Sequence, residues 1–265
     1  MMSHPSRCAL FLCCLFGTFP MVLPRSAAAV EPPAGLATPS ASPSLLRLTF
    51  VDPGNPVPTV PALDIRHNGD VFLSTDGRRV TPAGGLTDAE LRSLAAELTE
   101  RHGLLQISTP ILWQEIESSA RTTGLRPDVA GAATTVIEVQ SGEFRHRVEC
   151  PAVGLLARRY PQIADLQRLA AIQTRLQNVM AVQQVGGGAA ADLLAHEGTT
   201  QLRQSDPQAA PFSSREIAMV RTLSDGSQFV QFFRDARPQP VIVTLTRFPE
   251  SGPRVSVLNG AAELR

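Results

Sequence analysis

The stretch TTVIEVQSGEFRHRVEC, residues 134–150, decides how the middle of the chain folds. Its apolar and polar residues alternate, which is the pattern of half-buried β-strands. Ser141-Gly142 interrupts the alternation with residues that favour a tight turn. A two-residue loop there would pair Val139 with Phe144. The stretch therefore predicts an antiparallel hairpin.

This pairing gives the hairpin two faces. In the same register Ile137 lies opposite His146, and Glu138 lies opposite Arg145. The apolar face consists of Ile137, Val139, Phe144, His146, Val148 and Cys150. The charged face consists of Glu138, Glu143, Arg145, Arg147 and Glu149. Such a face stays in solvent, and our candidates for a protein-interaction face are Glu138, Arg145, Arg147 and Glu149.

His146 and Cys150 share a face, which raises the question of a nucleophile and its base. Four residues along a strand span about 13 Å, whereas a nucleophile and its base must approach within about 3 Å. One strand cannot bring the two side chains together. We therefore predict that Cys150 is a small buried thiol at the end of a strand and that His146 points inward.

Strand patterns also precede this region. LLRLTFVD, from Leu45, predicts a strand. Asn68-Gly69 is a strong signal for a type I′ hairpin turn, and this turn sets Ile65 opposite Phe72. With a second turn at Asp76-Gly77, the predicted strands are Ala62–His67, Asp70–Thr75 and Arg78–Thr81.

Two helices are predicted between the hairpins. Thr87 and Glu90 have the spacing of a capping box, and the apolar stripe that follows continues to a stop at Gly103. A shorter helix begins further along, with Thr109 as its cap and Pro110 at its first position.

The second half of the chain predicts helices and then strands. A short helix ends near Tyr160, and a long one spans Gln162–Gln184 before Gly186–Gly188 stop it. Residues 186–211 read as a linker that contains at most one short helix, at AADLLAHEG. Four strands of a β-meander follow, near REIAMVRTL, SQFVQFFR, PVIVTLTRF and RVSVLNG.

The N-terminus reads as a secretory signal peptide. An apolar run follows Arg7, and Ala27 and Ala29 have the spacing of a cleavage site before Val30. Pro20 and Pro24 leave the run short of the roughly 20 residues of a spanning helix, so we predict no stable membrane insertion after cleavage. The mature chain would be periplasmic or extracellular.

These patterns predict an α+β protein in which a hairpin–helix–hairpin–helix domain precedes a small antiparallel β-meander. The predicted segments are a signal peptide at 1–29, a disordered Pro/Ala/Ser-rich tether at 30–43, an α+β domain at 44–185, a linker at 186–211 and the meander at 212–265.

The composition excludes several chemistries. All 24 basic residues are arginine, so a lysine Schiff base, a P-loop lysine and a Ser-Lys dyad are absent. Without Arg7 and Arg25, 22 basic groups face 24 acidic ones, a balance of −2. That balance gives no reason to expect nucleic acid as a partner. We predict no cofactor.

No motif for a metal or a catalytic group is complete. HEGTT, from His196, would need a second histidine where Thr200 stands. We therefore predict no metal ligand and no catalytic residue. An enzyme with scattered residues stays an alternative. Its candidates are His146 with Asp64 or Asp70, and Ser213 and Ser214 near His196. A small-molecule or lipid carrier is a further alternative and would need an apolar cavity.

Three segments resemble the emfourin-type metallopeptidase inhibitor domains, and this resemblance covers about half the chain, Leu63–Val185. The segments are the Asn68-Gly69 hairpin, LTDAELRSL and VIEVQSGEFRHRV. The resemblance implies peptidase inhibition but supplies no reactive-site motif. The sequence thus favours an exported, non-enzymatic protein-binding module, with a protein as its partner.

Overall fold

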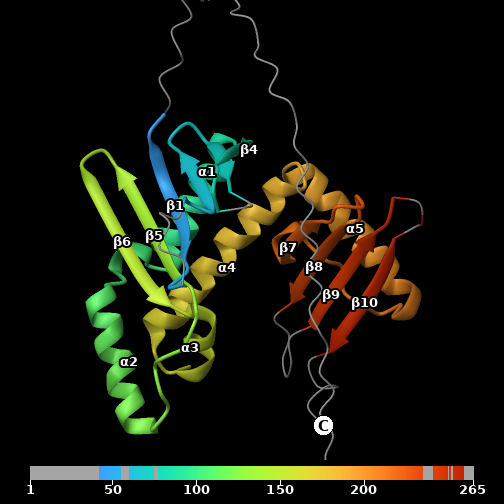
Figure 1. Cartoon of the computed structure of the whole chain (residues 1–265). Coiled ribbons are helices and arrows are strands. Elements are labelled where there is room, and N and C mark those ends of the chain that lie inside the picture. Colours follow the sequence, from blue (N-terminus) through green and yellow to red (C-terminus); the bar gives the residue numbers. More distant parts are fainter. Residues whose placement is uncertain are drawn as a thin grey trace, which may run out of the picture. The chain divides into compact units, whose positions relative to one another are not determined.

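The computed structural model describes residues 42–54, 60–74, 77–234, 241–249, 251 and 253–259. This part of the chain contains two antiparallel sheets and five α-helices (Figure 1), so the α+β class is confirmed. The described residues from Ser42 onward form one compact unit. The predicted signal peptide, 1–29, and nearly all of the predicted tether, 30–43, lie outside the described residues.

The first sheet has six strands in the order β4-β3-β2-β1-β5-β6. Each neighbouring pair is antiparallel, and β1 pairs with both β2 and β5. The strands are β1 Ser44–Val51, β2 Leu63–Arg66, β3 Asp70–Leu73, β4 Thr81–Gly85, β5 Thr134–Ser141 and β6 Phe144–Pro151. Figure 1 shows β5 and β6 as a long hairpin that ends the sheet on one side.

The register of the first hairpin differs from the prediction by one residue. Ile65 pairs with Val71 and not with Phe72. The loop holds three residues rather than two, because Gly69 adopts a φ of 85° and donates its N–H to the Arg66 carbonyl at 3.0 Å. A slip of one residue moves a side chain to the other face. Phe72 accordingly leaves the core side, and the Arg66 guanidinium covers its ring at 3.9 Å.

The predicted third strand, Arg78–Thr81, is wrong. Strand β4 begins at Thr81, where the predicted strand ends, and includes Pro82 and two glycines. It is an edge strand, the one position in a sheet where a proline without an N–H does little harm.

The register of the second hairpin differs from the prediction by two residues. Ser141 pairs with Phe144, so the loop is Gly142-Glu143 and Glu138 lies opposite Arg147. Gly142 has a φ of 60°, and a glycine at the first loop position is what a type II′ turn requires. Because the shift is even, each residue keeps its predicted face.

The five α-helices are α1 Asp88–Ala96, α2 Thr109–Thr123, α3 Val153–Arg159, α4 Ala164–Gln184 and α5 Gly188–Ser205. The predicted capping box is confirmed, since Thr87 N donates to Glu90 at 2.8 Å and Glu90 N donates to the Thr87 hydroxyl at 3.3 Å. Helix α1 continues into a π-helical turn, η1 Glu97–Arg101. The cap of α2 is Ser108 and not Thr109, which lies inside the helix and bonds to β6 instead.

The helices α1 to α4 pack on one face of the first sheet and bury a common core. Leu48, Leu63, Ile137 and Val148 are fully buried on that face. The cross-strand register puts all four on the same side of the sheet. The opposite face of the sheet carries the charged side chains described below.

The second sheet has the order β10-β9-β8-β7. Its strands are β7 Ile217–Thr222, β8 Gln228–Arg234, β9 Val241–Arg247 and β10 Arg254–Asn259, one in each predicted segment. The predicted linker at 186–211 is corrected, because most of it is the 18-residue helix α5. Helix α5 packs Ala191 and Leu194 in one core with Phe232 and Val243 of the sheet. No helix of the described residues is long and apolar enough to cross a membrane.

Candidate interaction face of the first sheet

Charged side chains form a row across the open face of the first sheet. The cross-strand register places Asp64 opposite Arg47, Arg47 opposite Glu138, and Glu138 opposite Arg147. Four neighbouring strands thus present charges of alternating sign at one level. Opposite charges on directly opposed residues attract each other, so this row is compatible with the sheet. Asp64, at one end of the row, is buried, whereas Arg147, at the other end, is exposed. We call these four residues the charged row.

Arg147 is the best-anchored member of the charged row. Its Nη1 lies 2.7 Å from Glu138 Oε1 and its Nη2 lies 3.0 Å from Glu149 Oε2. The bond to Glu149, opposed by partial burial and reinforced by Glu138, raises the pKa of Arg147 above its usual value. Three of the four predicted interaction residues are therefore held in one ion-pair network.

Arg145, the fourth predicted residue, stands outside this network. It lies opposite Gln140 in the register and is exposed. Within the described part of the chain no carboxylate pairs with it. Its guanidinium therefore keeps its donors available to a partner.

Arg47 and Ser44 complete a hollow on this face, and sequence reasoning missed both. Arg47 Nη2 donates to Ser44 Oγ at 2.9 Å, and Arg47 Nε lies 3.8 Å from Asp64 Oδ1. The sequence contained a signal for Arg47, because it is a charged residue within an apolar strand. Alternate residues of a strand point to opposite faces, so Arg47 could be assigned to the solvent-facing side.

The hollow has a volume of about 310 Å³, and its polar lining is Ser44, Arg47, Glu138, Gln140, Arg145, His146 and Arg147. Arg47 is paired with Asp64, and Arg147 with Glu138 and Glu149, so Arg145 is the arginine of this hollow that has no ion pair among the described residues. Guanidinium groups bind carboxylates with two parallel hydrogen bonds. The hollow is therefore chemically suited to a carboxylate.

His146 and Cys150 form no reactive pair. Cys150 is fully buried, as predicted, and burial raises the pKa of its thiol to about 12. The thiol donates to the Pro151 carbonyl at 3.5 Å. His146 is partly buried and stacks on Phe144 with ring centroids 6.5 Å apart. A thiol with so high a pKa is almost entirely protonated at neutral pH and is a poor nucleophile.

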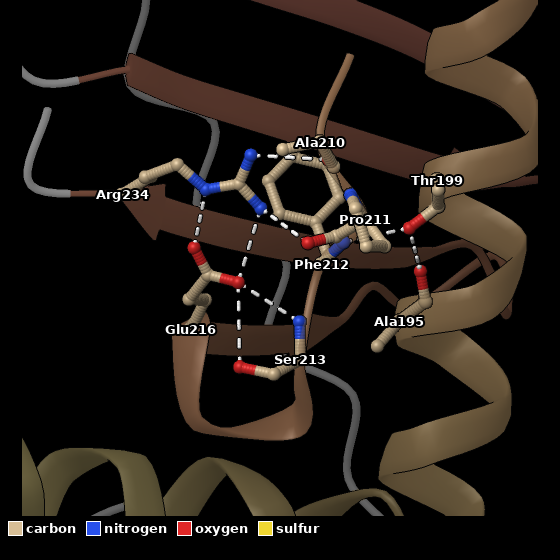
Figure 2. A network of polar contacts seen from close by, with 8 residues as sticks. All are labelled: Ala195, Thr199, Ala210, Pro211, Phe212, Ser213, Glu216 and Arg234. Carbon is tan, nitrogen blue, oxygen red and sulfur yellow. Dashed lines mark hydrogen bonds and ion pairs between the residues drawn. The ribbon is translucent and has the colours of Figure 1, made fainter.

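The alternative catalytic group at Ser213 has a different role. Ser213 N and Ser213 Oγ donate to Glu216 Oε2 at 2.8 and 3.3 Å (Figure 2), and Ser213 and Glu216 form the capping box of a short 3-10 turn. Arg234 Nη2 donates to the same oxygen at 3.1 Å and to the Pro211 carbonyl at 2.7 Å. The hydroxyl thus has a carboxylate acceptor already, and His196 is exposed on α5.

The network around Glu216 fastens the segment before β7 to its neighbours. Figure 2 shows the Arg234 guanidinium over the Phe212 ring, 4.5 Å from its centroid. Phe212 N donates to Thr199 Oγ1 at 2.8 Å, and Phe212 stacks on Phe232 at 4.6 Å. These contacts hold the segment between α5 and β8, so we assign the network a structural role.

A second polar cluster surrounds Glu97 at the start of η1. Its carboxylate lies 3.0 Å from Arg175 Nε, 3.7 Å from Arg101 Nη1 and 3.8 Å from Arg215 Nη1. Burial alone would raise the pKa of Glu97, but the bond from Arg175 and the charges of the three arginines lower it below its usual value of 4.5. The single carboxylate contacts all three cations, and a hollow of about 350 Å³ beside it is lined by Arg175, Arg215 and Asn178.

The incomplete HEGTT motif and the carrier alternative can be compared with the described residues. Thr200, which stands where a zinc peptidase has its second histidine, donates its hydroxyl to the His196 carbonyl at 3.0 Å. No group of three metal-ligating side chains occurs among the residues with a described position. The apolar cavity between Ile65, Leu94 and Leu104 measures about 60 Å³, far below the roughly 300 Å³ of small-ligand sites. A larger, open hollow of about 800 Å³ is lined by Phe50, Met180 and Val220, together with polar residues such as Ser74 and Gln184.

Comparisons with known proteins provide no further information on this site. No protein-family model, no curated protein and no solved structure matches the chain.

Proposed function

We propose that this chain is an exported, non-enzymatic module that binds an acidic protein partner through the open face of its first sheet. The observation that carries the proposal is the hollow between Arg47, Arg145 and Arg147, in which Arg145 has no ion pair among the described residues. Arg145 contributes an exposed guanidinium that no carboxylate of the described residues neutralises.

Two of the three arginines in the hollow are held in place before a partner binds, and this supports selective binding. Arg147 is held by two glutamates, and Arg47 is oriented by Ser44. A partner carboxylate therefore meets guanidinium groups that lose little conformational freedom on binding. Phe144, 48% exposed, lies next to Arg145 along β6 but on the other face of the sheet, where it adds apolar area at the same edge. Interfaces favour arginine together with aromatic residues.

The proposal also covers export of the chain and the roles of its segments. The signal peptide at 1–29 would export the chain, and the tether at 30–43 would separate the module from that end. Residues 44–185 would form the hairpin–helix–hairpin–helix binding domain, and the meander at 212–265 would follow it. Inhibition of a peptidase is one form that such binding would take.

The test compares partner capture by matched variants. The full chain, tagged at its C-terminus, is produced in its own host and recovered from the envelope and the medium. Wild type is compared with Arg145→Glu and with Arg92→Glu, a control with an exposed arginine on α1. Mass spectrometry of the purified chain also locates its N-terminus.

The proposal predicts one stoichiometric protein partner that wild type and Arg92→Glu capture and Arg145→Glu loses. It also predicts a mature N-terminus at or near Val30. Equal capture by all three chains would mean that another surface binds. Turnover of a substrate that vanished on changing a single side chain would overturn the non-enzymatic assignment.

A further inference from the structure

We propose that the outer edge of β6, from Phe144 to Arg147, accepts an extended segment of the partner as a seventh strand of the first sheet. The segment would alternate acidic and apolar residues. This inference rests on the proposed function and deepens it, because it names how the partner binds and which sequence pattern it carries.

The backbone of β6 supplies the hydrogen-bonding groups. β6 is the last strand of the sheet order, and β5 pairs with its other side. Glu149 N donates to Thr109 Oγ1 at 2.9 Å, so the N–H of Glu149 points away from β5. N–H groups two residues apart point to the same side of a strand, and the β5–β6 register has no irregularity. The N–H groups of Arg147 and Arg145 therefore also point outward.

Helix α2 limits the available length of this edge. Thr109, in the first turn of α2, occupies the N–H of Glu149, and Pro151 has no N–H to offer. Nothing in the described chain bonds to the outward N–H groups of Arg145 and Arg147. The free edge is thus the half of β6 near the turn, which spans about 13 Å.

The side chains along the free edge define the pattern of the added strand. Arg145 and Arg147 lie on the open face, and Phe144 and His146 lie on the other. A strand placed beside β6 puts alternate side chains next to these two pairs. Acidic residues would face the arginines, and apolar residues would cover the half-exposed Phe144 ring.

A second copy of this chain is a poor occupant of the same edge. Pairing of the free half of β6 with itself, with the faces matched, brings Arg145 opposite Arg145 or Arg147. Like charges that are directly opposed destabilise a strand pair, and charged edges are a common protection against self-pairing. The edge therefore repels its own copy and attracts an acidic strand.

The probe is an acetylated and amidated peptide of four Glu-Val repeats, labelled with fluorescein. Two control peptides are four Arg-Val repeats and a block peptide of four glutamates followed by four valines. Binding to the full chain is measured by fluorescence anisotropy. Hydrogen exchange of single amides is followed by NMR with and without the peptide.

The variants separate the backbone from the charge. Arg145→Ala removes the guanidinium and keeps the N–H, whereas Arg145→Pro removes both. Proline is tolerated where an edge N–H faces outward, so the β5–β6 ladder should survive. Circular dichroism checks that the proline variant folds, and the exchange measurement on wild type needs no variant at all.

We expect the alternating acidic peptide to bind more tightly than both controls. Arg145→Ala should weaken binding about tenfold, and Arg145→Pro should weaken it about fivefold further. The amides of Arg145 and Arg147 should exchange more slowly with the peptide bound, while those of Phe144 and His146, which face β5, should not change.

Peptide binding without protection of the Arg145 and Arg147 amides would overturn the edge proposal. Equal binding by Arg145→Ala and Arg145→Pro would overturn it too, and so would a stable dimer through β6. The proposed function would survive any of these outcomes if Arg145→Glu still lost the host partner that Arg92→Glu retained. The two failures are therefore distinguishable.

Discussion

Arg145 and Arg147 are the same residue type on the same face, yet their surroundings give them different roles. Arg147 is bound by Glu138 and Glu149, so it stabilises the sheet as well as lining the hollow. Arg145 is exposed and makes no ion pair within the described residues. Its guanidinium is free to contact a partner and contributes little to the folded state.

We predict that Arg145→Ala changes the free energy of unfolding by less than about 0.5 kcal/mol. Arg147→Ala should cost up to about 1 kcal/mol, because it breaks two largely exposed ion pairs. Urea unfolding at low salt measures both values. A loss of stability in Arg145→Ala as large as that in Arg147→Ala would show that Arg145 has a structural partner.

The thiol of Cys150 should be chemically silent in the folded chain. Burial raises its pKa to about 12, so the reactive thiolate is nearly absent at pH 8. We expect a maleimide reagent to leave the Cys150 peptide unmodified in the native chain and to modify it fully in guanidinium chloride. Peptide mass spectrometry reads the site directly. Rapid native labelling would contradict the burial.

At the scale of elements, short-range signals were predictable and registers were not. The capping box of Thr87 and Glu90 depends on residues three apart and appeared as predicted. The turn residues Asn68-Gly69 and Ser141-Gly142 located both hairpins. They did not determine the strand registers, because the register depends on the position that each glycine takes in its loop. A slip of one residue misplaced Phe72, whereas a slip of two left every face intact.

The length of helix α5 was underestimated from the sequence, and Gly198 explains why. Glycines at its start and within it favour a loop when the sequence is read locally. In the structure a Cβ at Gly198 would lie 2.9 Å from Phe232 Cε2. The glycine allows α5 to approach β8 closely, and this tertiary contact outweighs the poor helix propensity of glycine.

We predict that Gly198→Ala destabilises the chain by about 1 to 3 kcal/mol, because the added methyl group overpacks against a fully buried ring. Gly154→Ala is the matched control. It also lies in a helix, α3, but a Cβ there meets nothing within 4 Å, so alanine should add about 0.5 to 1 kcal/mol. Thermal unfolding gives both values. A stabilising Gly198→Ala would contradict the close packing of α5 on β8.

At the scale of the whole molecule, helix α4 is shared by the two cores. Leu166 and Ile172 pack in the core of the first sheet, and Ala181 packs in the core of the second. Asn178 Nδ2 donates to the carbonyls of Ser214 and Ile217 at 2.8 and 2.9 Å, at the entry to β7. No local sequence pattern predicts this connection, because Asn178 and its two partners are 36 and 39 residues apart.

The Glu97 cluster makes stability depend on pH with a definite sign. The pKa of folded Glu97 lies below its usual value of 4.5, so its stabilising effect is fully present above that pH and is lost as the pH falls through the folded pKa. Glu97→Gln should therefore be less stable than wild type by about 1 to 2 kcal/mol at pH 7.

The difference between wild type and Glu97→Gln should shrink steadily below pH 4.5, where the wild-type carboxylate becomes protonated. Denaturant unfolding at pH 7, 5 and 3 measures it. A difference that stayed constant with pH would mean that the loss arises from packing and not from the charge of Glu97.

The central claim is that the arginine hollow on the first sheet binds an acidic partner, and one titration tests it most directly. The purified host partner is titrated into wild type, Arg145→Glu and Arg92→Glu by isothermal calorimetry. The claim predicts at least about tenfold weaker binding for Arg145→Glu and wild-type affinity for Arg92→Glu. Equal affinities for all three chains would contradict it and would place the binding surface elsewhere on the molecule.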